Sequence, residues 1–369
     1  MKKVLMIGYC NKFFRKEFAS NIGDENCVFD ILSLEAPEKE SEKFYNKIFS
    51  CDNKFSGKIH TVLVYIKMLI ILLFLKKYDA IHIHSVKKIE SVYARLLRKK
   101  CKRLVCTIYG SDFYRINDFE KKKLSKLFEN SDYITIETSK TISDFNDFYN
   151  NAFSDKIVNI RFGIASLEEM QKLQRDDQHV RKLKINFEIP QNSFVITVGY
   201  NATKEQHHLD ILDQLKKIEN ILPDNYYIVI PLGYGDLNYG RRVAEYLKET
   251  GLKGICLFDF YTNDIIAQLR MISNIMIQLQ DTDSLSSSML EYLYADNIIV
   301  TGAWLPYKEI EKYIVQIDSI DVLDTYMEDI IDNWKNKIEC LKDTDYIDFL
   351  EKNFIWRNVK KAWVKLYVS

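Results

Sequence analysis

The sequence has few residues that break regular structure and no surplus of either charge. Its 369 residues include 5 Pro and 12 Gly, which excludes collagen-like and low-complexity chains. The 7 Cys form no CxxC pair and have no His at ligand spacing, so we expect reduced thiols and no metal site. Basic and acidic residues both number 52, a balance that argues against bulk nucleic-acid binding.

Several catalytic signatures are also missing. The sequence has no GxGxxG, GxxxxGK[ST], GxSxG or HExxH motif, which removes the main signals for dinucleotide cofactors, P-loop phosphoryl transfer, α/β-hydrolases and zinc proteases. We therefore expect no cofactor. The apolar stretch 62–77 is interrupted by Lys67, and its unbroken part 68–75 has eight residues, against roughly 20 needed to span a bilayer. We expect this segment not to cross a membrane.

What the sequence does contain is a regular alternation of strand-like and helical segments. Apolar runs typical of strands are separated by helical segments, at 3–8, 28–34, 80–85, 103–110, 133–138 and 157–163, and again at 193–200, 225–233, 255–260, 274–279 and 298–302. This order predicts an α/β protein of two doubly wound, Rossmann-like domains facing a cleft. The expected limits are 1–165 for the N-terminal domain, 166–190 for a linker, 191–345 for the C-terminal domain and 346–369 for terminal helix.

The zero net charge hides an uneven distribution. Residues 1–165 contain 29 Lys and Arg against 20 Asp and Glu, and the remainder carries the opposite excess of nine. Many of the basic residues follow an apolar helix predicted over 58–77. This combination favours contact with an anionic membrane surface. A buried crossover helix beside an ordinary solvated face is the alternative.

The segment 278–304 carries the most specific pattern, a strand, a polar loop, a Ser-rich helix start and another strand. Ser286, Ser287 and Ser288 can cap the helix and leave its first N–H groups directed at an anion. Asp283 precedes them, and Glu291 follows eight residues later. These carboxylates could hold sugar and ribose hydroxyls, although a plain capped helix would show the same pattern.

This segment resembles the donor site of GT-B glycosyltransferases of the large family-four group, whose pattern is an acidic residue, seven residues and Glu. Further similar stretches are ITVGY at 196–200, IRFGI at 160–164 and FIWRNVKKAWVKLY at 354–367. The resemblance implies that the last of these is a closing helix that crosses back to the first domain. It also implies retention of anomeric configuration, with Asp283 as a catalytic residue.

A narrower resemblance connects residues 100–310 with the 4-acetamido-4,6-dideoxygalactose (Fuc4NAc) transferases. It rests on VGYNATKEQHHLDIL at 198–212, VIPLGYGDLNYGRRVAEYLKETG at 229–251 and YGSDFY at 109–114. This family implies inversion, with Asp112 as the base. Asp112 could equally be a turn residue that binds its own backbone.

The two resemblances, together with positions at the carboxyl ends of predicted strands, give a set of candidate binding residues. For the donor they are Gly199, Tyr200, Asn201, Lys204, His208, Gly233, Tyr234, Arg241, Tyr261, Ser286, Ser287, Ser288 and Glu291. For the acceptor or another role they are Gly8, Tyr9, Tyr109, Gly110 and Arg161, of which Arg161 is also a candidate cation for the pyrophosphate. Tyr200 stands where the family-four group usually has Arg, and His208 could also be a simple helix cap.

The predicted function is transfer of a sugar from a nucleotide-sugar to a lipid-linked saccharide in bacterial surface polysaccharide synthesis. We expect a cytoplasmic protein, peripheral on the inner face of the cell membrane through its basic N-terminal domain. Three alternatives remain: an inverting Fuc4NAc-type transferase, a sugar-nucleotide 2-epimerase and a non-catalytic GT-B subunit.

Overall fold

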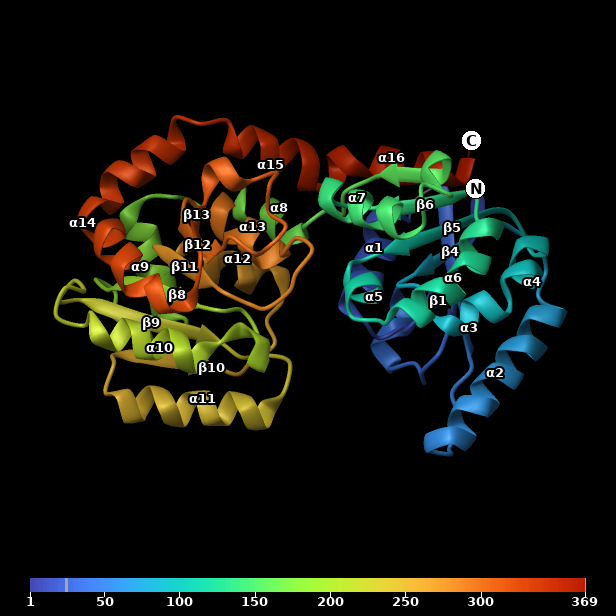
Figure 1. Ribbon diagram of the computed structural model, residues 1–369, viewed down its shortest axis with the longest axis horizontal. Coiled ribbons are helices and arrows are strands. Elements are labelled where there is room, and N and C mark those ends of the chain that lie inside the picture. The colour runs from blue at the N-terminus through green and yellow to red at the C-terminus, as the bar shows by residue number, and fades with distance from the viewer. Residues whose placement is uncertain (24–25, 369) are drawn as a thin grey trace. The chain divides into compact units, whose positions relative to one another are not determined.

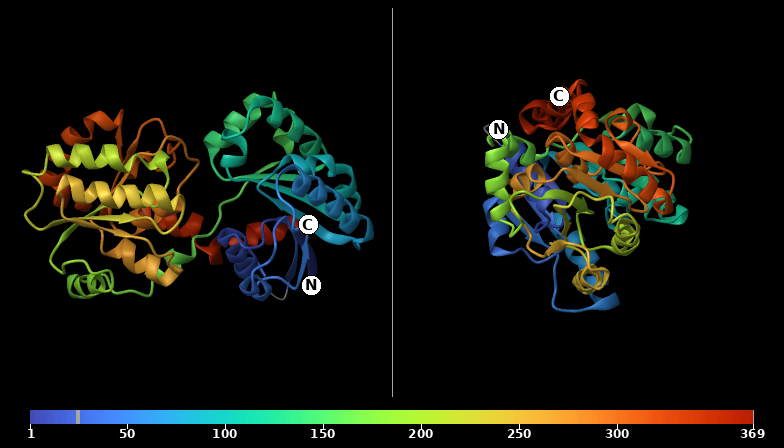
Figure 2. Two further views of the ribbon diagram at one scale, coloured as in Figure 1. Left: turned by 90° about the horizontal axis from the view of Figure 1, so that it is seen from below. Right: turned by 90° about the vertical axis from the view of Figure 1, so that its left-hand side faces the viewer.

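The computed structural model describes residues 1–23 and 26–368. The chain divides into two compact units. Unit 1 contains Met1–Gly163 together with the C-terminal segment from Trp356, and unit 2 contains Ile164–Ile355. Each unit is a parallel sheet with helices on both faces (Figures 1 and 2). The predicted α/β class is confirmed.

Unit 1 has a seven-stranded sheet in the order β3-β2-β1-β4-β5-β6-β7, and every neighbouring pair is parallel. The middle strands are mostly buried because both faces of the sheet are covered. The strands are β1 (Lys2–Gly8), β2 (Cys27–Ser33), β3 (Lys47–Ser50), β4 (Tyr78–His84), β5 (Cys101–Ile108), β6 (Tyr133–Ile136) and β7 (Ile157–Asn159).

The helices of unit 1 connect these strands. They are α1 (Phe13–Ile22), α2 (Gly57–Phe74), α3 (Lys88–Val92), α4 (Ala94–Lys99), α5 (Ser111–Tyr114), α6 (Asp118–Asn130), α7 (Ser139–Phe148) and α16 (Trp356–Val368), with the short 3₁₀ helices η1 (Lys39–Lys43) and η2 (Ser154–Lys156).

Unit 2 has six parallel strands in the order β10-β9-β8-β11-β12-β13. A buried apolar cluster covers each face of this sheet. The strands are β8 (Phe194–Val198), β9 (Tyr226–Pro231), β10 (Gly254–Leu257), β11 (Ile275–Gln278), β12 (Ile298–Gly302) and β13 (Val315–Ile317).

Its helices are α8 (Ala165–Met170), α9 (Asp177–Ile185), α10 (His208–Lys217), α11 (Leu237–Thr250), α12 (Asn263–Met271), α13 (Ser287–Tyr294), α14 (Leu323–Lys342) and α15 (Tyr346–Phe354), with 3₁₀ helices η3 (Lys204–Gln206), η4 (Glu311–Tyr313) and η5 (Ile320–Val322).

The unit boundaries differ from the predicted domain limits in two places. Residues 166–190, predicted as a linker, contain most of α8 and all of α9, and Leu167 and Phe187 are buried in the core of unit 2. At the other end only α16 packs on unit 1, whereas α15 stays in unit 2. Most residues of α9 are polar, so the sequence gives little sign of its buried ones. This explains why 166–190 was predicted as a linker.

In each sheet the strand order reverses at one point. In unit 1 this point lies between β1 and β4, and in unit 2 between β8 and β11. Ligands of open α/β sheets bind at the carboxyl ends of strands beside such a point. The loops that follow β1, β4, β8 and β11 are therefore the places where functional residues are expected.

Candidate functional site

The loop after β8 brings two polar side chains to the switch point of unit 2. Gly199 has φ of 65°, and a Cβ there would lie 2.6 Å from Nε2 of His208 and 3.0 Å from Oε1 of Gln206. Only glycine combines this backbone with such close neighbours. The predicted residues Gly199 and His208 are thus brought together.

Several buried polar atoms at this point have unused hydrogen-bonding capacity. Tyr200 Oη and Gln206 Nε2 both donate to Gln280 Oε1, at 3.2 and 3.0 Å. Oε1 of Gln206, Nε2 of His208 and Nε2 of Gln280 are buried without a hydrogen-bond partner among the residues that the structure describes. Burial lowers the pKa of His208 to about 3, so this imidazole is neutral at physiological pH.

Asp283 is held by a chain of hydrogen bonds from the sheet. Its carboxylate accepts bonds from the hydroxyl of Tyr307 and from the backbone N–H of Ser284. Gln278, the last residue of β11, donates to the Tyr307 hydroxyl at 3.1 Å, and Thr301 donates to Gln278 at 3.0 Å. Tyr307 was not among the predicted residues, because nothing in the sequence connects it with Asp283.

The start of α13 is built as the Ser-rich pattern predicts. Ser286 is the N-cap, and its hydroxyl accepts the N–H of Met289 at 3.4 Å. The hydroxyl of Ser286 also interacts with that of Tyr200, which connects α13 with the end of β8. Ser287 and Ser288 form the first turn and are partly exposed, so the helix presents its N-terminal N–H groups near this surface.

Glu291 lies in a buried ion pair. Its Oε2 accepts a bond from Nε of Arg270 at 2.9 Å, and its Oε1 accepts one from Ser166 at 2.6 Å. The guanidinium of Arg270 also donates to Tyr292 and to Ser288. Both charged side chains are less than a tenth exposed. Both oxygens of Glu291 thus already have protein partners. The contact of Glu291 with a ribose stays a prediction.

The other predicted donor residues lie along the rim of unit 2. A Cβ at Gly233 would lie 2.2 Å from the carbonyl oxygen of Asp259, so the loops after β9 and β10 touch at this glycine. Tyr234 is 47% exposed and its ring contacts that of Phe260, with centroids 6.1 Å apart. Tyr261 instead packs against Phe187.

Three further predicted residues of this rim differ in exposure. Asn201 is buried and accepts a hydrogen bond from Thr203. Lys204 and Arg241 are exposed, and Arg241 donates to Asn238 at 3.3 Å. Arg270 donates to Ser288 at the start of α13 at 3.3 Å. The sequence did not single it out because it precedes the motif, on α12.

The switch point of unit 1 contains a buried arginine. Arg15 is 6% exposed and donates to the carbonyl oxygens of Tyr9 and His84, at 3.3 and 2.6 Å. A Cβ at Gly8 would lie 2.5 Å from Arg15 Nε. Tyr109 donates or accepts a bond with Nδ1 of His84 at 2.8 Å. The predicted Gly8, Tyr9 and Tyr109 therefore surround an unpredicted cation.

Asp112 is anchored to the backbone. Its two oxygens accept the N–H groups of Tyr109, Gly110 and Val86, at 2.9, 3.1 and 3.0 Å. Burial raises the pKa of Asp112 to about 6, although the bonds from Tyr109 and Val86 lower it. This geometry matches the interpretation of a turn residue, and the role of base stays a prediction.

Arg161 is placed beneath the C-terminal helix. Its carbonyl oxygen accepts the indole N–H of Trp363 at 2.9 Å, and burial lowers the pKa of its guanidinium. His82 also lies under α16, with Nδ1 2.6 Å from the hydroxyl of Tyr367 and Nε2 2.6 Å from that of Thr107. Both residues therefore help to hold α16 on unit 1.

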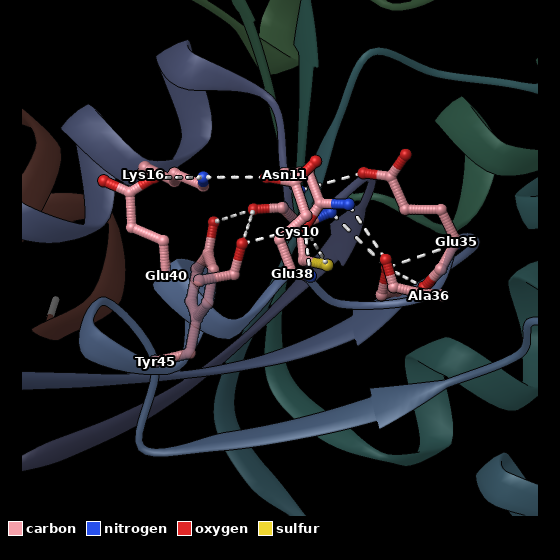
Figure 3. Close-up of polar contacts among 10 residues, drawn as sticks. Cys10, Asn11, Lys16, Glu35, Ala36, Glu38, Glu40 and Tyr45 are labelled. Atoms are coloured by element: carbon pink, nitrogen blue, oxygen red, sulfur yellow. Dashed lines mark hydrogen bonds and ion pairs between the residues drawn. The ribbon is translucent and has the colours of Figure 1, made fainter.

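A loop that the sequence did not predict is fastened beside the end of β1 (Figure 3). The side-chain carbonyl of Asn11 accepts bonds from the N–H of Glu38 and the hydroxyl of Ser41. Its side-chain amide N–H donates to the backbone carbonyl of Ala36. Lys16 contacts Glu38 and Glu40 at 3.8 and 3.7 Å. Residues 35–41 are thus fixed next to Gly8 and Tyr9.

Comparison with known proteins agrees with this architecture. Residues 3–138 match the model of the family described as "Glycosyl transferase 4-like". No curated protein matches the sequence.

Among solved structures, a glycosyltransferase from Rickettsia africae has 15% identity and a TM-score of 0.76, with 99% of this chain and 97% of that chain covered. HepE from Anabaena, in complex with UDP and glucose, has 11% identity and a TM-score of 0.74, with 99% of both chains covered. UDP-GlcNAc 2-epimerase from Neisseria meningitidis, bound to UDP-GlcNAc, has 13% identity, a TM-score of 0.64 and 99% coverage of both chains.

These likenesses establish the GT-B fold for the whole chain, and the family match covers the strands and helices of unit 1 from β1 to β6. The narrower resemblance to Fuc4NAc transferases stays a prediction. The prediction of a glycosyltransferase is confirmed: the chain has the GT-B fold, and residues 3–138 match the model of the glycosyl transferase 4-like family.

Proposed function

We propose that the chain transfers a sugar from a nucleotide-activated donor to a saccharide acceptor, with the donor bound by unit 2. The observation that carries this proposal is the set of buried, unused polar atoms on Gln206, His208 and Gln280. Buried polar groups are normally hydrogen-bonded. A ligand that approaches the backbone of Gly199 would complete these bonds.

The start of α13 supplies the second requirement, a place for a diphosphate. N–H groups at a helix N-terminus bind anions, and the helix dipole favours negative charge there. In the transfer, the bond between the anomeric carbon and a diphosphate oxygen breaks, and a bond to the acceptor oxygen forms. The negative charge that develops on the diphosphate would be stabilised by α13, so the proposed reaction requires no metal.

We further propose that transfer retains the anomeric configuration, with Asp283 beside the sugar ring. Support comes from the bonds of Tyr307 and Ser284 to Asp283, which fix its carboxylate at the carboxyl edge of the sheet. An inverting reaction with Asp112 as base is the alternative. NMR of the anomeric proton of the product decides between them, because a β product from an α donor contradicts retention.

The proposed acceptor is a lipid-linked saccharide of surface polysaccharide synthesis, bound by unit 1 at the cytoplasmic face of the membrane. The support is electrostatic. The four basic residues Arg357, Lys360, Lys361 and Lys365 of α16 raise the basic excess of unit 1 from 9 to 13. A lipid-linked diphosphate would be attracted to such a surface.

Thermal-shift measurements with UDP, GDP, TDP and CMP test donor binding. We expect one nucleotide, with UDP as the first candidate, to raise the melting temperature. In Gly199→Ala the added methyl group would meet His208 and Gln206, and we expect the ligand-induced shift to disappear. The matched control is Gly251→Ala, which has a similar φ of 72° and no contact closer than 4.0 Å. Failure of all four nucleotides contradicts the proposal.

The remaining alternatives are separated by turnover. With a radiolabelled donor and a crude lipid-linked acceptor, a transferase moves the label into the lipid fraction. A 2-epimerase converts the donor sugar in the absence of acceptor. A non-catalytic subunit shows the thermal shift but neither reaction.

A further inference from the structure

Helix α2 exposes an apolar side that nothing in its own unit covers. Among the described residues it is the one helix long and apolar enough to cross a membrane by length and composition, yet 17% of that window is buried. Figure 1 shows it at the edge of unit 1. Its outward apolar side chains are between 37% and 85% exposed: Ile59, Val62, Ile66, Leu69, Ile70, Leu73 and Phe74. The interpretation of a buried crossover helix is therefore wrong.

The opposite side of α2 is firmly attached to unit 1. Val64, Met68 and Leu72, spaced four residues apart, are buried in its apolar core. The hydroxyl of Tyr93 donates to the carbonyl of Tyr65 at 2.8 Å. A perpendicular crossing of the bilayer would pull these side chains out of the core. The attachment instead suits a helix that lies flat, with one side on protein and the other on lipid.

Positive charge surrounds this apolar side. Residues 54–103 contain 13 Lys and Arg but two acidic residues, Asp79 and Glu90. Asp79 is paired with Lys102 at 2.8 Å, and Glu90 is 1% exposed. Lys58 is exposed near the start of α2, and Lys76 and Lys77 are exposed just after its end. Apolar residues flanked by lysines are the pattern of a helix that binds an anionic leaflet.

We propose that α2 binds an anionic bilayer in the plane of the leaflet, with Ile66 and Leu73 among the acyl chains and Lys76 and Lys77 at the headgroups. A second copy of this chain is disfavoured as the occupant, because pairing the two α2 surfaces would bring two strongly basic segments together. The inference rests on the proposed function for its biological purpose, since the proposed lipid-linked acceptor would lie at the same surface.

Vesicle flotation of the full chain tests this proposal. We expect binding to vesicles that contain phosphatidylglycerol, and markedly weaker binding to pure phosphatidylcholine or at high salt. Ile66→Ser/Leu73→Ser removes apolar side chains that are 46% and 55% exposed, and should lower the bound fraction by about tenfold or more. The matched control, Ile185→Ser/Val322→Ser, changes side chains 56% and 37% exposed in unit 2 and should bind like the wild type.

The orientation is read from Ile66→Trp, at the middle of α2. Brominated lipids quench its added fluorescence best with bromine near the headgroup if the helix lies in plane, and best with bromine at the chain ends if it spans. Three results would overturn the proposal. The quenching could show a spanning helix, or the Ile66→Ser/Leu73→Ser variant could float as well as the wild type. The wild type could also fail to float and instead form a dimer that the Ile66→Ser/Leu73→Ser variant dissociates. Nucleotide thermal shifts measured without lipid report separately on the proposed function.

Discussion

At the residue scale, the ion pair between Arg270 and Glu291 determines how the start of α13 is held. Both side chains are buried, and a charge taken out of water is tolerated only when a partner and further hydrogen bonds compensate it. Here Tyr292, Ser288 and Ser166 supply those bonds. Burial lowers the pKa of Arg270, but Tyr292 and Glu291 more than offset this effect and raise it.

Removing one partner should therefore cost more than removing both. We expect Glu291→Gln to lower the free energy of unfolding by about 3–5 kcal/mol, because it leaves the guanidinium of Arg270 buried without its counter-charge. Arg270→Met/Glu291→Leu should lower the free energy of unfolding less than Glu291→Gln alone. Urea denaturation in a double-mutant cycle measures this coupling. A Glu291→Gln variant with wild-type stability but weakened nucleotide binding would identify Glu291 as a ligand instead.

At the element scale, α16 completes unit 1 although it is the last helix of the chain. Trp363 is fully buried, and its ring centroid lies 5.0 Å from that of Phe18 and 4.9 Å from that of Phe162. At the start of the helix, Trp356 donates its indole N–H to Glu17 at 2.9 Å. Unit 1 thus buries apolar surface against a segment more than 190 residues away in sequence.

This dependence predicts a defect confined to one unit. Trp363→Ala should destabilise unit 1 by about 3–5 kcal/mol, the usual cost of removing a buried tryptophan. Hydrogen exchange should show lost protection in β1, β4 and α1 but not in β8 or β11. Trp334→Ala, which removes a ring packed on Phe194 of unit 2, is the control and should show the reverse. Equal loss in both units after either change would mean that they unfold together.

The elements also show which features local sequence could predict. Long apolar runs such as those of β1 and β5 are recognisable because both sheet faces are covered. β3 and β13, with four and three residues, are too short for a periodic signal. The same limit applies to the site. Spacing predicted Ser286 as a cap, but the contacts of Asp283 with Tyr307 and of Glu291 with Arg270 depend on tertiary packing, which no local pattern contains.

At the scale of the whole molecule, both units bury histidines in neutral form. Burial lowers the pKa of His82 in unit 1 and of His208 in unit 2 to about 3 each, and lowers that of His84 as well. An unfolded chain has an ordinary histidine pKa of about 6.5. Below that pH the unfolded state takes up protons that the folded state does not. The contribution of these neutral histidines to the free energy of unfolding is therefore complete above pH 6.5 and is lost as the pH falls toward 3.

Substitution of one histidine should make this pH dependence measurable. Because folded His82 stays neutral, we expect the free energy of unfolding to fall by about 2 kcal/mol between pH 6.5 and pH 5. His82→Gln should remove this part of the loss.

His207 gives the opposite sign. Burial lowers its pKa, but hydrogen bonds to Asp281 and Asp210 raise it overall. The stabilisation from His207 is therefore present below pH 6.5 and is lost as the pH rises above it. His207→Gln should therefore weaken the fold most in acid. Urea denaturation of the three proteins across this range gives the answer, and parallel curves would contradict both assignments.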